Sequence, residues 1–108
     1  EGIQVWDMRN LTEPVIKIDW GVTSMGDPIN RAYNAVKFVP GMSMIVAGCT
    51  DDIAAKCFNF KMGGTVMQDF YKLQRSCFTI DVCKDGSQVA LGDYCGNLQV
   101  ENLVYASL

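Results

Sequence analysis

The sequence predicts an all-β protein made of repeated antiparallel sheets, and three observations support this class. Short segments that alternate apolar and polar residues follow one another along the chain, separated by turns rich in glycine, aspartate and serine. Residues 44–47 are apolar at every position, so we expect this strand to be covered on both faces. Two stretches of the chain also share one order of strands and turns.

The composition is typical of a folded domain. The chain has 108 residues, of which 49% are hydrophobic, and a net charge of −3. Its nine Lys and Arg residues are scattered, which argues against nucleic-acid binding, and its apolar runs are far shorter than the roughly 20 residues of a membrane span. The chain starts directly in the strand pattern "GIQVWDMRN", so we expect it to be a piece of a longer protein.

The first half of the chain contains five expected strands. Residues 2–7 and 14–20 alternate, whereas "GVTSMGDPIN" at 21–30 has the glycines and the Asp-Pro pair of a long surface loop. Three more strands, divided by "PGMS" and "CTDD", are expected at 35–39, 44–47 and 53–60.

The second half continues this pattern after the turn "KMGG". Its expected strands are 65–70, 77–82, 88–91 and 98–103, with turns at "KDGS" and "GDYCGN". Residues 65–76 also fit helical spacing, so a helix there is an alternative to the strand. We favour the strand, because two glycines precede the segment and the surrounding chain is β.

The internal repeat aligns "NAVKFVPGMSMIVAGCTDDIAAKCFNF" with "CFTIDVCKDGSQVALGDYCGNLQVENL". Each copy has an apolar strand, a turn, a second apolar strand, an acidic turn and a third strand. The third strands also match the opening "GIQVWDM". This alignment places Trp6, Phe58 and Glu101 in one column and Asp7, Asn59 and Asn102 in the next.

These motifs resemble the WD-repeat family, whose units of about 40 residues form four-stranded propeller blades. The resemblance rests on "VWDMRN", "AGCTDD" and "CKDGSQVALGD", in which Asp85 and Gly86 match the family's Asp-Gly turn. Only the first unit keeps the literal Trp-Asp pair, and the chain has no Gly-His dipeptide. The family's buried hydrogen-bond tetrad therefore cannot form intact, and Asp52 is its best remaining carboxylate.

The resemblance implies a segment of a WD-repeat β-propeller with between two and three four-stranded antiparallel blades. Each blade lies between two others, so the strands at 44–47 and 89–91 are expected to be buried on both faces. The expected division is a blade end with third and outer strands at 1–20, a loop at 21–33, a complete blade at 34–70 and most of a further blade at 71–108.

The sequence predicts no catalytic, cofactor or metal site. It contains no histidine, and its five cysteines lack the close pairs typical of zinc sites, so we expect them to be buried structural thiols. Asp51 and Asp52 could serve a cation or acid–base chemistry, but capping of backbone amides is the favoured interpretation.

Three side chains are candidates for protein contacts. Trp20 ends an outer strand before a long loop, and exposed aromatic side chains can anchor interfaces. Lys72 and Arg75 could meet an acidic partner, although a solvated face is the favoured interpretation. Trp6, by contrast, is expected in the core.

The resulting hypothesis is a non-enzymatic interaction scaffold within a multiprotein assembly, by analogy of fold. The stretches "VWDMRNLTEPVIKI" and "CFTIDVCKDGSQVALGDYCGNLQVENL" resemble the late blades of dynein intermediate chains. The stretch "AGCTDDIAAKCFNF" is similar to a G-protein β-subunit blade, and the former resemblance is favoured. The former implies dynein heavy chain and other motor subunits as partners, and a cytoplasmic, cytoskeletal or ciliary location. The alternatives are an enzyme whose active site lies outside this segment or at the propeller mouth, and a small ligand-binding β domain.

Overall fold

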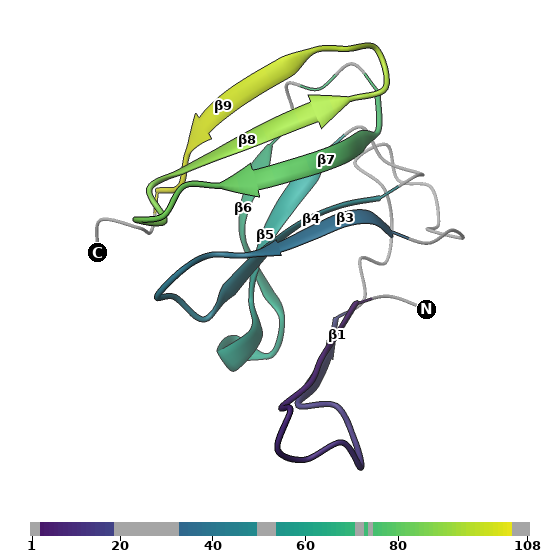
Figure 1. Cartoon of the computed structure of the whole chain (residues 1–108), viewed down its shortest axis with the longest axis vertical. Coiled ribbons are helices and arrows are strands. Elements are labelled where there is room, and N and C mark those ends of the chain that lie inside the picture. Colours follow the sequence, from purple (N-terminus) through teal and green to yellow (C-terminus); the bar gives the residue numbers. More distant parts are fainter. Residues whose placement is uncertain (1–2, 19–32, 50–53, 71–72, 74, 105–108) are drawn as a thin grey trace.

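The computed structural model describes residues 3–18, 33–49, 54–70, 73 and 75–104 (Figure 1). These residues form nine strands and one short 3₁₀ helix, arranged as three antiparallel sheets that follow one another along the chain. No helix among them is long and apolar enough to cross a bilayer. The all-β class predicted from the sequence is confirmed.

The first sheet is a two-stranded hairpin of β1 (Ile3–Val5) and β2 (Ile16–Ile18). Ile3 lies opposite Ile18 in the antiparallel register, and both side chains are buried against the second sheet. The alternation in the sequence therefore divides this hairpin into a packed face and an exposed face.

The second sheet has four strands in the order β3-β4-β5-β6, and each strand pairs with the next one in sequence. The 3₁₀ helix η1 stands between β5 and β6. The bounds are Tyr33–Phe38 for β3, Met44–Cys49 for β4, Ala55–Asn59 for β5, Phe60–Met62 for η1 and Thr65–Phe70 for β6.

The helical alternative for residues 65–76 is wrong for the part that forms β6. This strand pairs with β5, with Phe70 opposite Ala55. Lys56 and Asp69 also lie opposite each other, and their side chains form an ion pair at 2.6 Å. The residue spacing fitted a helix as well as a strand, and pairing with β5 decides in favour of the strand.

The third sheet has three described strands in the order β7-β8-β9. They are β7 (Cys77–Val82), β8 (Gln88–Asp93) and β9 (Leu98–Asn102). The first strands of the second and third sheets share one irregularity, because β3 and β7 each have a bulge after their first residue. The two sheets thus repeat each other in detail.

Equivalent backbone hydrogen bonds close the β3–β4 and β7–β8 turns. The amide of Val39 donates to the carbonyl of Met44 at 2.9 Å, and the amide of Cys83 donates to that of Gln88 at 3.1 Å. The residue that follows β5 or β9 is hydrogen-bonded to the same turn. The amide of Phe60 donates to the carbonyl of Ser43 at 2.9 Å, and the amide of Leu103 donates to that of Ser87 at 2.8 Å.

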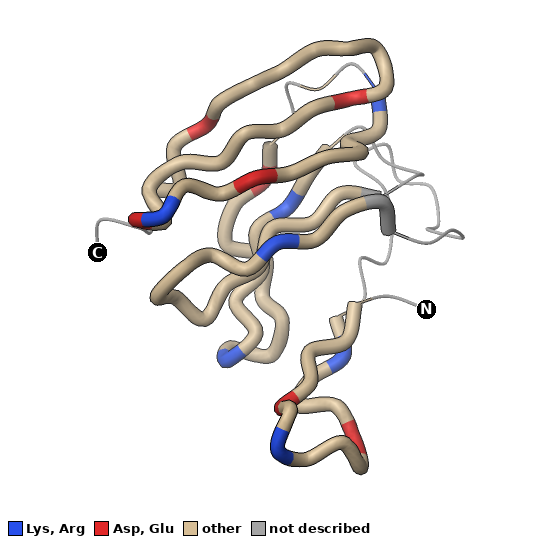
Figure 2. The backbone as a smooth tube through the Cα atoms, in the orientation of Figure 1, with Lys and Arg blue, Asp and Glu red and all other residues tan. Residues whose placement is uncertain are grey.

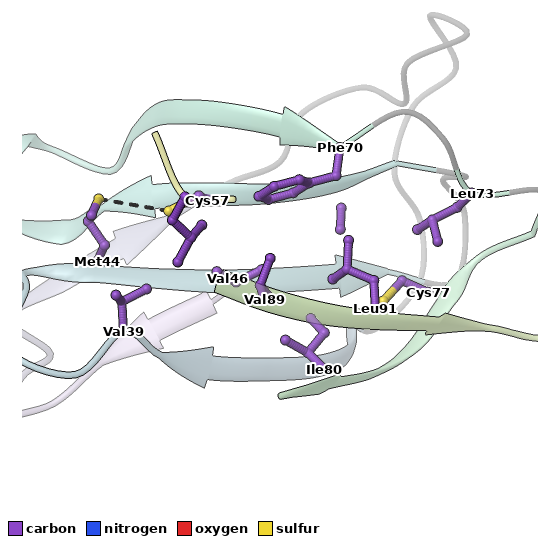
Figure 3. Packing of buried hydrophobic residues seen from close by; sticks show 12 residues of the cluster. Val39, Met44, Val46, Cys57, Phe70, Leu73, Cys77, Ile80, Val89 and Leu91 are labelled. Atoms are coloured by element: carbon purple, nitrogen blue, oxygen red, sulfur yellow. Dashed lines mark hydrogen bonds between the residues drawn. The ribbon is translucent and has the colours of Figure 1, made fainter. Parts of the chain in front are cut away.

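The larger apolar core lies between the second and third sheets (Figure 3). Phe70 and Leu73 belong to this core, and the Cys57 thiol lies 3.8 Å from the sulfur of Met44 within it. A smaller core lies between the first and second sheets and includes Phe58. The three sheets therefore stack as successive layers.

Strand β4 is covered on both faces, as its uninterrupted apolar run predicts. Ile45 and Ala47 belong to the core beneath the first sheet, whereas Met44 and Val46 belong to the core beneath the third sheet. All four side chains are almost completely buried.

Strand β8 departs from this prediction. Val89 and Leu91 are fully buried on the face toward the second sheet. Ala90, on the other face, is only partly buried. The two-sided burial expected for residues 89–91 is therefore wrong among the described residues, because none of their sheets covers that outer face.

Candidate interaction surface

The column of Asp7, Asn59 and Asn102 marks the end of each third strand. The Oδ1 atom of Asp7 accepts a hydrogen bond from the amide of Arg9 at 2.9 Å. The Oδ1 atom of Asn59 likewise accepts from the amide two residues ahead, that of Lys61, at 3.0 Å. Asn102 differs, because its Oδ1 accepts from the Gln88 side chain at 3.2 Å. The first two members of the column therefore cap the turn after their strands.

The side chain of Arg9 also contacts Asp7. Its Nη2 donates to Oδ2 of the carboxylate at 2.8 Å, and this contact is the main reason why the pKa of Asp7 is lowered from its ordinary value. Both groups lie on the exposed turn of the first hairpin, where an ion pair adds little stability.

Trp6 and Phe58, which share the column before Asp7 and Asn59 in the internal alignment, differ in burial. Phe58 is fully buried between the first and second sheets. Trp6 is 41% exposed, so its expected place in the core is wrong. Trp6 continues the exposed positions of the β1 segment, on the side opposite Ile3, and none of the described sheets covers that side.

Asp85 organises the β7–β8 turn through one oxygen atom. Its Oδ1 accepts from the Cys83 thiol at 2.8 Å, the Ser87 hydroxyl at 2.6 Å and the Ser87 amide at 3.0 Å. These donors stabilise the charged form, the thiol most of all, and lower the pKa of Asp85 to about 2.

Gly86 lets this turn rest on the corresponding turn of the second sheet. Its φ of +74° favours glycine. A Cβ atom here would come within 3.1 Å of the Pro40 carbonyl oxygen and 3.2 Å of Val39 Cγ1. Asp85 and Gly86 thus shape a turn and a contact between sheets.

Asp93, at the end of β8, is the buried charged residue of the described chain. Its Oδ1 accepts from the amides of Cys95 at 2.9 Å and Asn97 at 3.0 Å. Its Oδ2 accepts from the Asn97 side chain at 3.2 Å and from the Arg75 amide at 3.3 Å. The carboxylate therefore holds the β8–β9 turn to the chain that enters β7. The sequence showed it only as one of several acidic turn residues.

Of the predicted contact residues, the structure describes Arg75. Its side chain is exposed at the start of the third sheet. Trp20, Lys72, Asp51 and Asp52 lie outside the described residues, so their expected roles remain predictions.

The four cysteines whose side chains the structure describes divide into two classes, and Cys49 lies outside them. Cys57 and Cys77 are buried, and burial raises the pKa of Cys57 to about 11. Cys83 and Cys95 are exposed free thiols, so the expectation that the cysteines are buried is wrong for these two. They stand in turns, where neighbouring apolar residues in the sequence do not predict burial. The described residues contain no group of three or more His, Cys, Asp or Glu side chains that could hold a metal ion.

The outer face of the third sheet is apolar and uncovered. Leu98 and Val100 of β9 occupy the register positions that Ala55 and Cys57 occupy in β5. The two β5 side chains are fully buried beneath the third sheet, whereas Leu98 is 71% exposed. The repeat therefore marks this face as one that packs against another sheet.

Strand β3 of the second sheet also exposes apolar side chains at positions that are buried in its counterpart, β7. Val36 of β3 corresponds in register to Ile80 of β7. Ile80 is 5% exposed in the core, but Val36 is 51% exposed, as is its neighbour Phe38 at 62%. The two strands of the first sheet cover β4 and β5 but leave this part of β3 open.

A pair of exposed aromatic rings at the start of the third sheet was not predicted. Phe78 of β7 and Tyr94 of the β8–β9 turn stack with ring centroids 4.9 Å apart and an interplanar angle of 26°. The strand registers place Phe78 at the bulge position of β7 that Asn34 holds in β3, so an aromatic residue at this position is not shared by the two sheets.

The comparisons with known proteins identify the architecture. No family model matches the sequence, and no curated protein matches it. A solved structure described as "Structure of Dos1 propeller" superposes with a TM-score of 0.64 at 17% sequence identity. The match covers 90% of this chain and 23% of that one. This chain is therefore an all-β segment of a β-propeller, with between two and three antiparallel blades.

Proposed function

We propose that this chain is a section of a non-enzymatic propeller that serves as an interaction scaffold in a multiprotein assembly. The exposure of Leu98, Val100, Val36 and Phe38, at positions whose repeat counterparts are largely buried, supports a section of a longer propeller. The scaffold role is inferred by analogy of fold. Soluble monomers rarely leave contiguous apolar faces of this kind in water. Further protein surface is therefore needed on both sides of the segment.

The finer assignment rests on the strand-end and turn motifs. The Asp7 and Asn59 caps and the Asp85–Gly86 turn are similar to WD-repeat features. On this basis the chain divides into a blade end at 1–20, a loop at 21–33, a complete blade at 34–70 and most of a further blade at 71–108. The similarity of "VWDMRNLTEPVIKI" and "CFTIDVCKDGSQVALGDYCGNLQVENL" to late blades of dynein intermediate chains supports a subunit of that type. Its partners are then other motor subunits, in the cytoplasm or at the cytoskeleton or cilium, with Trp20, Lys72 and Arg75 among the contact residues.

A small-ligand site receives less support. One cleft, beside β1 and β3, has a volume of about 130 Å³ and is lined mainly by apolar side chains such as Val5, Phe38 and Ile45. Another, on the outer face of the third sheet, measures about 190 Å³. Both are smaller than typical ligand pockets of roughly 300–1,000 Å³. Both also lie on faces that the repeat marks for packing against sheets.

The test is purification of the full-length protein from its source under native conditions, followed by size measurement and mass spectrometry. The proposal predicts a complex with other subunits at fixed stoichiometry. A full-length protein that is monomeric throughout purification would contradict the scaffold function. A stable complex without a dynein heavy chain would reject the dynein assignment alone.

A further inference from the structure

The chain that leaves β9 is bound by a side chain of the second sheet. Leu103, the first residue after this strand, is 4% exposed and belongs to the larger core. The Nε2 atom of Gln68 in β6 donates to the carbonyl of Asn102 at 2.9 Å, and its Oε1 accepts from the amide of Val104 at 3.0 Å. One side chain therefore holds the backbone on both sides of Leu103, in an exit segment formed by residues 102–104.

The second sheet treats the corresponding position differently. Asn59, the counterpart of Asn102, offers its carbonyl to the amide of Gly64 at 3.0 Å, and this bond closes the turn that leads through η1 into β6. The Asn102 carbonyl is bound to the side chain of Gln68 instead. At this point of the third sheet, a contact between sheets thus stands where the second sheet has a contact within a turn.

A bulge in β6 brings Gln68 to the third sheet. The register skips Met67, because Cys57 pairs with Gln68 and Phe58 pairs with Val66. Successive residues of a regular strand point to opposite faces, and a bulge interrupts this alternation. Met67 packs against the larger core, and Gln68, the next residue, reaches the exit segment. The bulge therefore turns two consecutive side chains toward the third sheet.

Packing between sheets does not explain an amide side chain at this position. Gln68 lies opposite Cys57 in the second sheet. In the first sheet, Val5 holds the position of Cys57 in the internal alignment, and Ile16 lies opposite it and packs against the smaller core. The repeat thus accepts an apolar residue here. A glutamine amide adds a donor and an acceptor side by side, which matches one backbone carbonyl and one backbone amide.

The contact between Gln68 and the exit segment involves no charged group. Figure 2 shows the acidic and basic residues of the described chain spread over all three sheets. Both hydrogen bonds of Gln68 join a neutral side chain to backbone groups, so salt does not screen them as it screens exposed ion pairs.

We propose that Gln68 is a latch that fixes the path of the chain as it leaves β9, and that this latch opens without unfolding of the sheets. Exposed hydrogen bonds compete with water and each contributes little, so local opening costs far less than global unfolding. When the latch is open, Leu103 still holds the segment through its buried side chain and its bond to Ser87. This inference does not depend on the scaffold function, because it concerns contacts within the described chain.

The experiment is hydrogen exchange of the full-length protein, followed by fragmentation mass spectrometry that resolves single backbone amides. The variant is Gln68→Ile, which introduces the residue of the first sheet and removes both hydrogen bonds. The control is Val66→Thr, which changes an exposed β-branched side chain on the same strand. Each protein is measured at low and at high salt.

The proposal predicts a local effect. The Val104 amide should exchange about tenfold faster or more in Gln68→Ile, because it loses its acceptor, and should stay within about twofold of the wild type in the control. The Leu103 amide should change less, since its bond to Ser87 remains. The ratio of variant to wild-type rates should be the same at both salt concentrations.

Three results would overturn the proposal. An unchanged Val104 rate in Gln68→Ile would remove the latch. Equal acceleration throughout β7 and β8 would mean that Gln68 stabilises the whole third sheet and not the exit segment. Wild-type exchange at Val104 as slow as that of the central amides of β8 would mean that the contact opens only when the protein unfolds.

Discussion

Replacement of Asp93 tests how much one buried carboxylate contributes to the third sheet. Hydrogen bonds to a charged acceptor contribute about 1.5–3 kcal/mol each. Two short bonds, from the amides of Cys95 and Asn97, end on this group at 2.9 and 3.0 Å. Cys95 is exposed, so water takes over part of its bond. We therefore expect Asp93→Ala to lower the free energy of unfolding by about 3 kcal/mol.

Two further variants make this measurement specific. Asp93→Asn keeps one acceptor oxygen but turns an NH₂ group toward the donors of Arg75 and Asn97, so we expect roughly half the loss. Asp81→Asn is the control, because Asp81 is exposed on the same sheet and its hydrogen bond comes from the adjacent amide of Val82. We expect the control to change stability by less than about 0.5 kcal/mol.

The assay is urea unfolding of the full-length protein, followed by far-UV circular dichroism. Asp93→Ala should shift the transition well below that of the Asp81→Asn control, with Asp93→Asn between them. Equal transitions for Asp93→Ala and Asp81→Asn would refute the role assigned to the buried carboxylate.

Three other predictions follow from the turns and the thiols. Gly86→Ala should destabilise the protein by at least about 1 kcal/mol more than Gly41→Ala in the same urea assay, because both glycines have positive φ but only the first has neighbours near an added Cβ; equal losses would argue against the contact between turns. The pKa of Asp85 is about 2 in the folded protein against an ordinary value of 3.8, so its contribution to stability is present above pH 3.8 and is lost as the pH falls toward 2; an NMR titration of the carboxyl carbon with a midpoint near 4 would contradict this. Iodoacetamide should modify the exposed Cys95 rapidly and Cys57 only after unfolding, since the latter is buried and its pKa is raised to about 11; peptide mass spectrometry that finds equal rates would refute the assigned burial.

The sequence was most informative where a local rule determines the structure. The turns "PGMS" and "KDGS" carry glycines at the positive-φ positions that such turns require, and both close a hairpin. The apolar run of β4 predicted burial on two faces, because a strand with one wet face would alternate. In both cases the residues that form the pattern are also the residues whose conformation or burial it predicts, so no distant part of the chain is needed.

The sequence was least informative where burial depends on a distant part of the chain. Trp6 and Phe58 hold the same repeat position, but only Phe58 has a described sheet over it. Asp93 resembles any acidic turn residue until the fold brings Arg75 and Asn97 to its two oxygens. The aromatic pair gave no signal in the sequence, because Phe78 and Tyr94 come together only when the bulge of β7 and the β8–β9 turn meet at one end of the sheet.

The most direct test of the account is an experimental structure of the full-length chain. We predict that a further antiparallel sheet packs on Leu98 and Val100 of β9 and that additional inner strands cover Val36 and Phe38 of β3. A structure in which these side chains remain in water, or lie beneath a layer of helices, would contradict the propeller account.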